Sequence, residues 1–260
     1  MAKKKYIYDE NLTKEENLLL EHLYAFNTSQ MAVALKKQFL NPNENLKDFH
    51  TRISDIINYE WQQRQQKKLD KLFDRKLFDQ ATLKYPNADF DEALYEPERM
   101  LDIHMIEQLQ RCGYIREPRN LLITGSSGTG KTHIANALCI AAMHQFISAK
   151  YIRANTLLQL CVKEEINGTI YEYINELASY DLLVIDDFGL MDLNMDKCRH
   201  LFEVIETRDS RKSTIIVSQF PVLKWWDLFQ ENTYADAVLS RMTKQAYRLE
   251  CNGRDMRQSN

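Results

Sequence analysis

Residues 121–138, LLITGSSGTGKTHIANAL, join an apolar run to a helical segment through a glycine-rich loop that contains a single lysine. Residues 125–132 of this stretch satisfy the pattern G-x-x-x-x-G-K-[ST]. Glycines permit the tight backbone path that points successive N–H groups at phosphate oxygens, and the amino end of the next helix adds its positive dipole. Because the motif lies between a predicted strand and a predicted helix, the sequence predicts a P-loop α/β domain.

The loop residues have separate expected roles at a bound nucleoside triphosphate. Lys131 is expected to reach the β- and γ-phosphates, and the hydroxyl of Thr132 is expected to bind Mg²⁺. The predicted nucleotide-binding residues of this stretch are Gly125, Ser126, Ser127, Gly128, Thr129, Gly130, Lys131, Thr132 and His133.

A second pattern, LLVIDDFG at residues 182–189, is an apolar strand that ends in two acids. A carboxylate at a strand end can hold a metal ion through its water shell, while the next one can polarise an attacking water. Asp186 is therefore the predicted carboxylate of the Mg²⁺ site, and Asp187 is the predicted base.

Two other motifs share letters with this acidic stretch. D-F-G at residues 187–189 occurs in protein kinases, but no H-R-D-x-x-x-x-N loop precedes it. D-x-x-G at residues 186–189 occurs in GTPases, but no N-K-x-D or T-K-x-D follows it. ATP is therefore the expected nucleotide.

After Pro118, short apolar runs alternate with amphipathic helical segments, which favours a parallel sheet covered on both faces. The predicted strands are NLLITG, AKYIRA, LLVIDD, STIIVSQ and AYRLEC. If the fourth strand packs between the P-loop strand and the acidic strand, Gln219 at its end would lie beside the γ-phosphate. There it could orient a water or sense the phosphate, although the Ser-Gln-Phe-Pro sequence is also typical of a simple turn.

Residues 1–97 contain no glycine, which argues for helices rather than hairpins. Thr13 and Glu16 form a capping-box pattern, and Ser29 is expected to cap a second helix. Residues 45–78 form either one long helix or two helices separated by a bend. We expect an all-helical domain at 1–97, a linking helix at 98–118 and the nucleotide-binding domain at 119–260.

The formal net charge is −3, so any contact with nucleic acid must come from local patches. The five cysteines lie far apart without a C-x-x-C pair, which is typical of reduced thiols, in the core and at the surface, of a cytoplasmic protein. No apolar run approaches the roughly 18 residues of a membrane-spanning helix. The amino-terminal MAKKKYIYDE also lacks the apolar region of a signal peptide.

A basic run lies in the third helical stretch and carries a local excess of four positive charges over Asp70 and Asp74. It could follow a DNA backbone, although most charge runs on long helices are solvated faces. The residues of this run are Arg64, Lys67, Lys68, Lys71, Arg75 and Lys76. The paired Trp225 and Trp226 are expected to pack in the core rather than to stack on bases.

The chain resembles the IstB-like transposition helpers, the ATPase partners of transposases in two-gene insertion sequences and a branch of AAA+ proteins near the DnaC-type helicase loaders. The matching segments follow the family order over residues 119–257: RNLLITGSSGTGKTHIANALCIAA, YDLLVIDDFGL, RKSTIIVSQFPVLKWWDLF, ADAVLSRM and GRDMRQ. The amino-terminal YEWQQRQQKKLDKL also resembles the family, less specifically. This resemblance implies an AAA+ P-loop three-layer α/β/α domain with a five-stranded parallel sheet and no C-terminal lid, preceded by a small all-α N-terminal domain. It also implies an acidic strand that is not adjacent to the P-loop strand.

By the same resemblance, ATP and Mg²⁺ would support a homo-oligomer on double-stranded DNA, largely without sequence specificity, that recruits and stimulates a transposase. Arg241 would be an arginine finger that reaches a neighbouring subunit, and Arg257 a sensor arginine near the nucleotide. Arg208 or Arg211 is a weaker candidate for a subunit or DNA contact. The candidate catalytic residues are Lys131, Asp186, Asp187, Gln219 and Arg241.

Many AAA+ proteins carry glutamate at the position of Asp187 and asparagine at that of Gln219, so slow hydrolysis is expected. Two other function classes stay open. A replicative helicase loader would share the ATPase core, and a P-loop metabolic kinase would need a small-substrate pocket that the sequence does not indicate. The surroundings of Gln219 and Trp225 and the basic run favour transposition.

Overall fold

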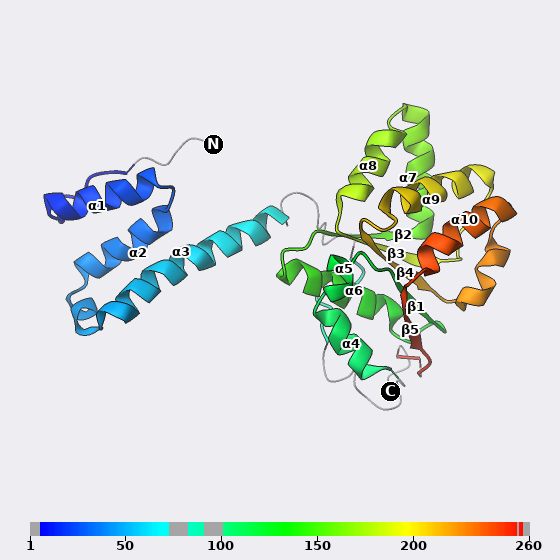
Figure 1. The fold of residues 1–260 in the computed structure, drawn as a ribbon, viewed down its shortest axis with the longest axis horizontal. Helices are drawn as coiled ribbons and strands as arrows, with labels where there is room; N and C mark the ends of the chain where they lie inside the picture. The colour runs from blue at the N-terminus through cyan, green and yellow to red at the C-terminus, as the bar shows by residue number, and fades with distance from the viewer. Residues whose placement is uncertain (1–5, 73–82, 91–100, 254, 257–260) are drawn as a thin grey trace. The chain divides into compact units, whose positions relative to one another are not determined.

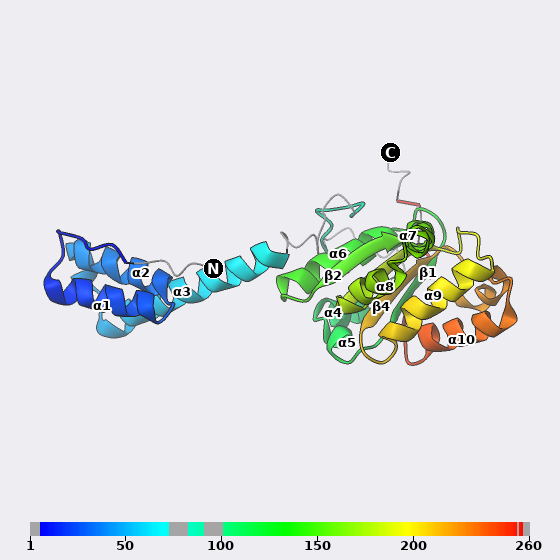
Figure 2. The ribbon, with the colours of Figure 1, turned by 90° about the horizontal axis from the view of Figure 1, so that it is seen from above.

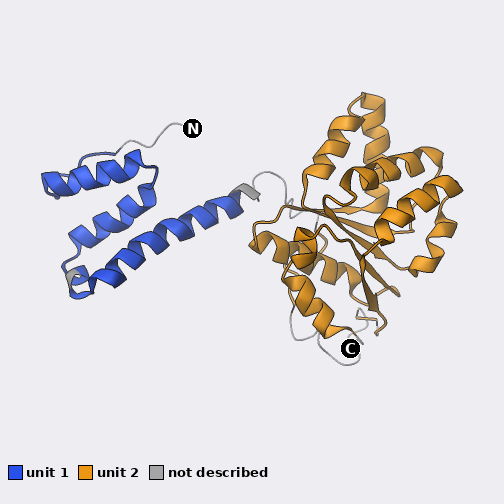
Figure 3. Ribbon diagram, viewed as in Figure 1, with its two compact units in different colours: residues 1–71 blue, residues 72–260 orange. Residues whose placement is uncertain are grey.

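The computed structural model describes residues 6–72, 83–90, 101–253 and 255–256. It divides into a compact unit at residues 1–71 and a second unit at residues 72–260 (Figure 3). The domain boundaries that we expect at residues 97 and 118 stay a prediction, and residues 73–82 and 91–100 lie outside the described part.

The first unit contains α1 (Lys14–Ala25), α2 (Ser29–Leu40), a 3-10 turn (Pro42–Leu46) and α3 (Phe49–Leu72), which is one continuous helix over its described length (Figure 1). The predicted capping box is confirmed: the Glu16 N–H donates to Thr13 Oγ1 (3.2 Å), and the Thr13 N–H donates to the Glu16 carboxylate (2.8 Å).

The predicted cap at Ser29 is wrong, because α2 begins at Ser29 itself and Thr28 before it makes no side-chain cap. The Glu60 carboxylate from α3 takes this place by accepting the N–H groups of Gln30 and Met31, both at 2.9 Å. Burial raises the pKa of Glu60, but hydrogen bonds from Arg64 and these amides outweigh it and hold that pKa below its usual value.

The second unit is built on a parallel five-stranded sheet in the order β2-β3-β4-β1-β5. The strands are β1 (Leu121–Gly125), β2 (Ala149–Arg153), β3 (Leu182–Phe188), β4 (Ser213–Ser218) and β5 (Tyr247–Cys251). All five predicted strands are therefore confirmed. Strand β4 lies between the P-loop strand β1 and the acidic strand β3, as the resemblance implied.

Helices cover both faces of this sheet (Figure 1; Figure 2). Alternate residues divide between two cores, since Leu121 and Ile123 lie in one and Leu122 in the other. The first core includes residues of α4 (Ile103–Gln110), α5 (Gly113–Arg116) and α6 (Lys131–His144). The second includes residues of α7 (Ala154–Asn167), α8 (Ile170–Ser179), α9 (Met195–Arg208) and α10 (Asn232–Thr243). The predicted three-layer α/β/α arrangement is confirmed.

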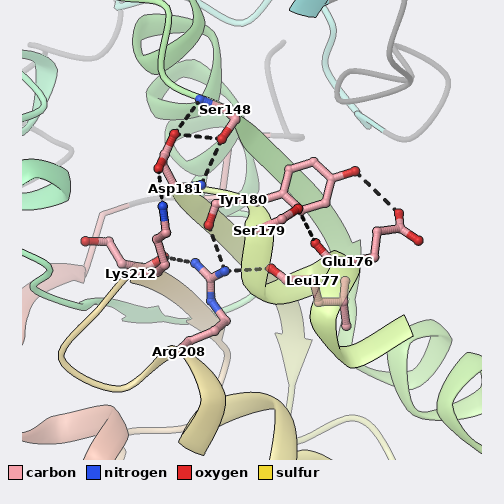
Figure 4. Close-up of polar contacts among 9 residues, drawn as sticks. Ser148, Glu176, Leu177, Ser179, Tyr180, Asp181, Arg208 and Lys212 are labelled. Carbon is pink, nitrogen blue, oxygen red and sulfur yellow. Dashed lines mark hydrogen bonds and ion pairs between the residues drawn. The ribbon is translucent and has the colours of Figure 1, made fainter. Parts of the chain in front are cut away.

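Arg208 is a buried structural residue at the amino ends of the strands, with 1% of its surface exposed. Its guanidinium donates to the carbonyl oxygens of Leu177 (2.7 Å), Tyr180 (2.9 Å) and Ser213 (2.5 Å), which ties the end of α8 to the start of β4 (Figure 4). Burial lowers the pKa of Arg208 to about 10. The idea that Arg208 contacts DNA or another subunit is therefore wrong, whereas Arg211 is exposed and stays a candidate.

A second polar cluster lies beside Arg208. Asp181 accepts hydrogen bonds from Ser148 Oγ (2.7 Å) and from Lys212 Nζ (2.5 Å), which joins the residues just before β2, β3 and β4 (Figure 4). All five cysteines are buried and free, so the expectation that some lie at the surface is wrong. None of the described helices combines the length and the apolar character that crossing a bilayer demands.

Candidate nucleotide site

A cavity of about 270 Å³ opens where β1, β3 and β4 reach their carboxyl ends. Nine of the predicted site residues line it: Ser127, Gly128, Gly130, Lys131, Thr132, His133, Asp186, Asp187 and Gln219. The two sequence motifs therefore meet in one place, although 55 residues separate Lys131 from Asp186. Of the other predicted residues, Gly125, Ser126, Thr129 and Arg241 are not part of this lining, and Arg257 lies outside the described residues.

The P-loop backbone depends on its glycines. Gly128 has a φ of +82°, in the left-handed region, and a Cβ there would lie 1.9 Å from Asp255 Oδ1. A Cβ at Gly125 would lie 2.1 Å from the carbonyl oxygen of Cys251. Side chains at these two positions would push the loop away from the carboxyl-terminal segment that packs against it.

Lys131 is the first residue of α6 and is 7% exposed. Its Nζ donates to the carbonyl oxygen of Ser126 (2.6 Å), and Thr129 Oγ1 donates to the same oxygen (2.9 Å). The ammonium group thus lies over its own loop, at the amino end of a helix, where an anion is favoured.

Asp186 and Thr132 form a hydroxyl–carboxylate pair. Thr132 Oγ1 donates to Asp186 Oδ2 (2.9 Å), and the Asp187 N–H donates to Asp186 Oδ1 (2.8 Å). Hard oxygen donors of this kind are the ligands that Mg²⁺ prefers, and few protein ligands are needed beside phosphate and water. The donor set therefore fits an Mg²⁺ site, with Thr132 and Asp186 as its residues.

The backbone at Asp187 departs from regular strand geometry. The β3–β4 register shifts between Ile185 and Phe188, and Asp187 has a φ of +57°. Its carboxylate lines the cavity and forms an ion pair with Arg153 Nε at 3.5 Å. This geometry leaves Asp187 able to approach a water in the cavity, while Arg153 restrains it from the β2 side.

Gln219 follows β4 and lines the cavity, as expected for a strand between β1 and β3. Ser218 before it is buried and donates from Oγ to the carbonyl oxygen of Phe188 (2.7 Å). Trp225 is fully buried against Phe188, which confirms its predicted core role. Trp226 is 41% exposed and donates from Nε1 to Asp236, so the prediction that it packs in the core is wrong.

Sequence reasoning missed the cavity wall formed by residues 83–90 and by Met256. Lys84, Tyr85 and Met256 all line the cavity. The Tyr85 and His133 rings lie 5.6 Å apart between centroids, and the Met256 N–H donates to the carbonyl oxygen of Gly128 (2.9 Å). No motif marks these residues, because only the folded chain brings them to the P-loop.

Residues 22–260 match the family described as IstB-like ATP-binding proteins. The chain belongs to this family. The ATP-binding protein of insertion sequence IS1162 from Pseudomonas fluorescens is 35% identical over 202 residues, 78% of this chain and 85% of the relative. The insertion sequence ATP-binding protein y4pL of Sinorhizobium fredii is 32% identical over 241 residues, 92% of this chain and 96% of the relative.

Solved structures share the fold of this IstB-like chain. The DnaC helicase loader has a TM-score of 0.54 at 21% identity, covering 65% of this chain and 98% of that one. AMPPCP-bound DnaA from Aquifex aeolicus has a TM-score of 0.51 at 23% identity, covering 70% of this chain and 53% of that one. The predicted family, the AAA+ P-loop fold class and the enzyme class, an ATPase, are confirmed.

Arg241 of the IstB-like chain lies near the other end of β1. Asn120, just before β1, donates from Nδ2 to the carbonyl oxygen of Arg241 (3.0 Å). The Arg241 side chain forms an ion pair with Glu206 and lies over the Phe202 ring, 5.1 Å from its centroid. A strand of five residues spans about 16 Å, longer than an arginine side chain, so Arg241 does not reach the P-loop of its own chain.

The basic run is only partly described. Arg64 is held within the first unit, because its guanidinium pairs with Glu60 (2.6 Å) and donates to the carbonyl oxygen of Asn27 (2.8 Å). Lys67 and Lys68 are exposed on α3. The side chain of Lys71, together with Arg75 and Lys76, lies outside the described residues.

Proposed function

We propose that this chain is the ATP-dependent helper of an insertion sequence, which assembles on double-stranded DNA and recruits and stimulates a partner transposase. The observation that carries the proposal is that Lys131, Thr132, both acids of β3 and Gln219 all line one cavity. Mg²⁺, when bound, would neutralise phosphate charge and orient the triphosphate.

The chain's own residues divide the work in this proposal. Lys131 and the P-loop amides bind the phosphates, and Thr132 and Asp186 hold the metal. Asp187 accepts the proton of the attacking water at Oδ1, the carboxylate oxygen that does not face Arg153, and Gln219 orients that water. Release of Asp187 from Arg153 would make its second oxygen available to the same water.

The oligomer places Arg241 of one subunit at the nucleotide of the next. This is supported by its position near the amino end of β1, beyond reach of its own P-loop, and by its partial exposure of 29%. An arginine supplied by a neighbour would make hydrolysis depend on assembly. The proposal includes DNA and a transposase as partners because the sequence relatives are named for insertion sequences.

Sedimentation tests this assembly. The purified protein is spun with ATP and Mg²⁺, with and without duplex DNA of 50–60 base pairs, on the order of five helical turns. We expect a large complex that requires both ATP and duplex DNA, and that shrinks as salt rises because phosphate contacts release counterions. ADP in place of ATP is the control.

The alternative, a helicase loader, predicts a different result. It would prefer single-stranded DNA and bind tightly to a hexameric helicase. If the protein does not assemble on duplex DNA but does assemble on single-stranded DNA, the transposition proposal is contradicted and the helicase-loader alternative is favoured.

We also propose that Tyr85 contacts the nucleoside of the bound nucleotide. Tyr85 lines the cavity, and the centroid of its ring lies 5.6 Å from that of His133, the residue that follows Thr132. Replacing Tyr85 by alanine should weaken ATP binding roughly tenfold, since stacking of a base on an aromatic ring contributes about 1–3 kcal/mol. Tripolyphosphate lacks a base, so competition titrations should show that it binds the wild-type protein and Tyr85→Ala with equal affinity.

Tyr171 provides the matched control, because it is 77% exposed on α8 and is not part of the cavity lining. Tyr171→Ala should leave both affinities unchanged, and Tyr85→Phe should keep ATP binding. Equal losses for ATP and tripolyphosphate in Tyr85→Ala would show that Tyr85 only supports the loop.

A further inference from the structure

Tyr151 on strand β2 lies against the acidic strand at the nucleotide site. Side chains alternate between the faces of a sheet, and Tyr151 and Val184 belong to the same core as the P-loop helix α6. Asp186 is two residues beyond Val184 on β3, so it faces the same side. The Tyr151 hydroxyl reaches Asp186 Oδ2 at 2.5 Å.

Two hydroxyl groups therefore donate to one carboxylate oxygen. Thr132 Oγ1 donates from the P-loop helix at 2.9 Å, and Tyr151 donates from β2. Both Tyr151 and Asp186 are buried, with 5% and 2% of their surface exposed. A hydrogen bond to a charged group is strong where water is excluded, so this contact constrains the carboxylate.

The two donors approach Asp186 from different elements. In the sheet order β2-β3-β4-β1, Tyr151 comes from the neighbour of β3 that lies away from the P-loop strand. Thr132 belongs to the segment that is expected to contact nucleotide and metal, whereas Tyr151 does not line the cavity. Tyr151 can thus hold Asp186 whatever the P-loop binds.

We propose that Tyr151 is a positioning residue for the metal site: its hydroxyl fixes the orientation of the Asp186 carboxylate toward the metal. The inference rests on the proposed function, because it assumes that Asp186 serves Mg²⁺ at a nucleotide. Partners of metal-binding carboxylates affect metal affinity strongly although they do not touch the metal.

The direction of this hydrogen bond follows from its groups: the phenol hydroxyl of Tyr151 donates, and Asp186 Oδ2 accepts.

The test is the variant Tyr151→Phe, which removes the hydroxyl and keeps the buried ring. Binding of a fluorescent ADP analogue is measured in EDTA and then as Mg²⁺ is added. We expect unchanged affinity in EDTA and a rise of about tenfold in the Mg²⁺ concentration that gives half of the metal-dependent change. The EDTA measurement also reports that the variant is folded.

Tyr173→Phe is the matched control. The Tyr173 hydroxyl is also buried, and it has no hydrogen-bond partner among the described residues. Its removal should leave the Mg²⁺ dependence unchanged.

The outcomes separate the inference from the proposed function. If the wild-type protein binds no nucleotide, both are overturned. If it binds nucleotide with Mg²⁺ and Tyr151→Phe gives the same Mg²⁺ dependence, only the positioning role is overturned. A lower melting temperature with unchanged Mg²⁺ dependence would likewise reduce Tyr151 to a packing residue.

Discussion

Lys131→Ala should lower the affinity for ATP by about 10- to 100-fold, the loss that follows when a charge-assisted hydrogen bond worth about 1.5–3 kcal/mol is removed. The Lys131 ammonium is nearly buried at the amino end of α6 and lies over the P-loop carbonyl of Ser126. Lys84 also lines the cavity, but it belongs to residues 83–90 and not to the P-loop. Isothermal titration of ATP into the purified variant measures the effect.

Lys163→Ala is the control for Lys131. Lys163 is exposed on α7 and is not part of the cavity lining, so its loss should change neither ATP affinity nor DNA-dependent assembly. Wild-type affinity in Lys131→Ala would contradict the assignment of this cavity to the triphosphate. A melting curve in the absence of ligand separates loss of binding from loss of the fold.

Arg241→Ala should slow DNA-stimulated ATP hydrolysis by about 10³-fold, the lower end of what arginine fingers supply. Binding of ATP to the isolated subunit should not change, because Arg241 lies beyond reach of its own P-loop. In the described structure, Arg241 is tied to Glu206 and Phe202, so the proposed assembly would have to redirect its side chain. Phosphate release on duplex DNA measures the rate.

A mixing experiment shows whether Arg241 acts between subunits. Oligomers of Arg241→Ala alone and of Lys131→Ala alone should both be inactive. Mixed oligomers should regain activity, because an intact Arg241 from one variant would meet an intact P-loop of the other. A mixture without recovered activity would contradict action in a neighbour, and normal rates in Arg241→Ala would contradict any catalytic role.

Arg248→Ala controls for the loss of one exposed positive charge near the same end of the sheet. Arg248 lies on the edge strand β5 and is exposed. Its replacement should leave hydrolysis unchanged. A loss equal to that of Arg241→Ala would indicate a general electrostatic effect on DNA binding.

The local parts of the site could be predicted from the sequence. The P-loop needs glycines, a lysine and a hydroxyl at fixed spacing within one turn, so the motif specifies the geometry. The acid pair was predicted for a similar reason, since an apolar strand that ends in two acids places them at a sheet edge. The order of the strands came from the family resemblance rather than from periodicity.

Residues that depend on distant contacts could not be predicted. Tyr85, Tyr151 and Met256 reach the site from three segments, and none carries a local pattern that indicates this. The prediction for Arg208 is wrong because an arginine in an amphipathic helix usually lies at the surface, whereas tertiary packing buries this one beside three carbonyl acceptors.

The cap of α2 shows the same limit on a smaller scale. Ser29 has the residue type that local rules favour at a helix start. The carboxylate of Glu60 supplies the acceptor instead, 30 residues away in sequence from Gln30. A contact of this range leaves no trace in the local sequence pattern.

The backbone conformation of Asp187 constrains how the nucleotide site could change in evolution. Its φ of +57° lies in a region that aspartate and asparagine adopt more readily than longer residues. Exchanging Asp187 for the glutamate of many AAA+ proteins would therefore disturb the backbone as well as move the carboxylate. We therefore expect the residue type at position 187 and the register shift between β3 and β4 to change together.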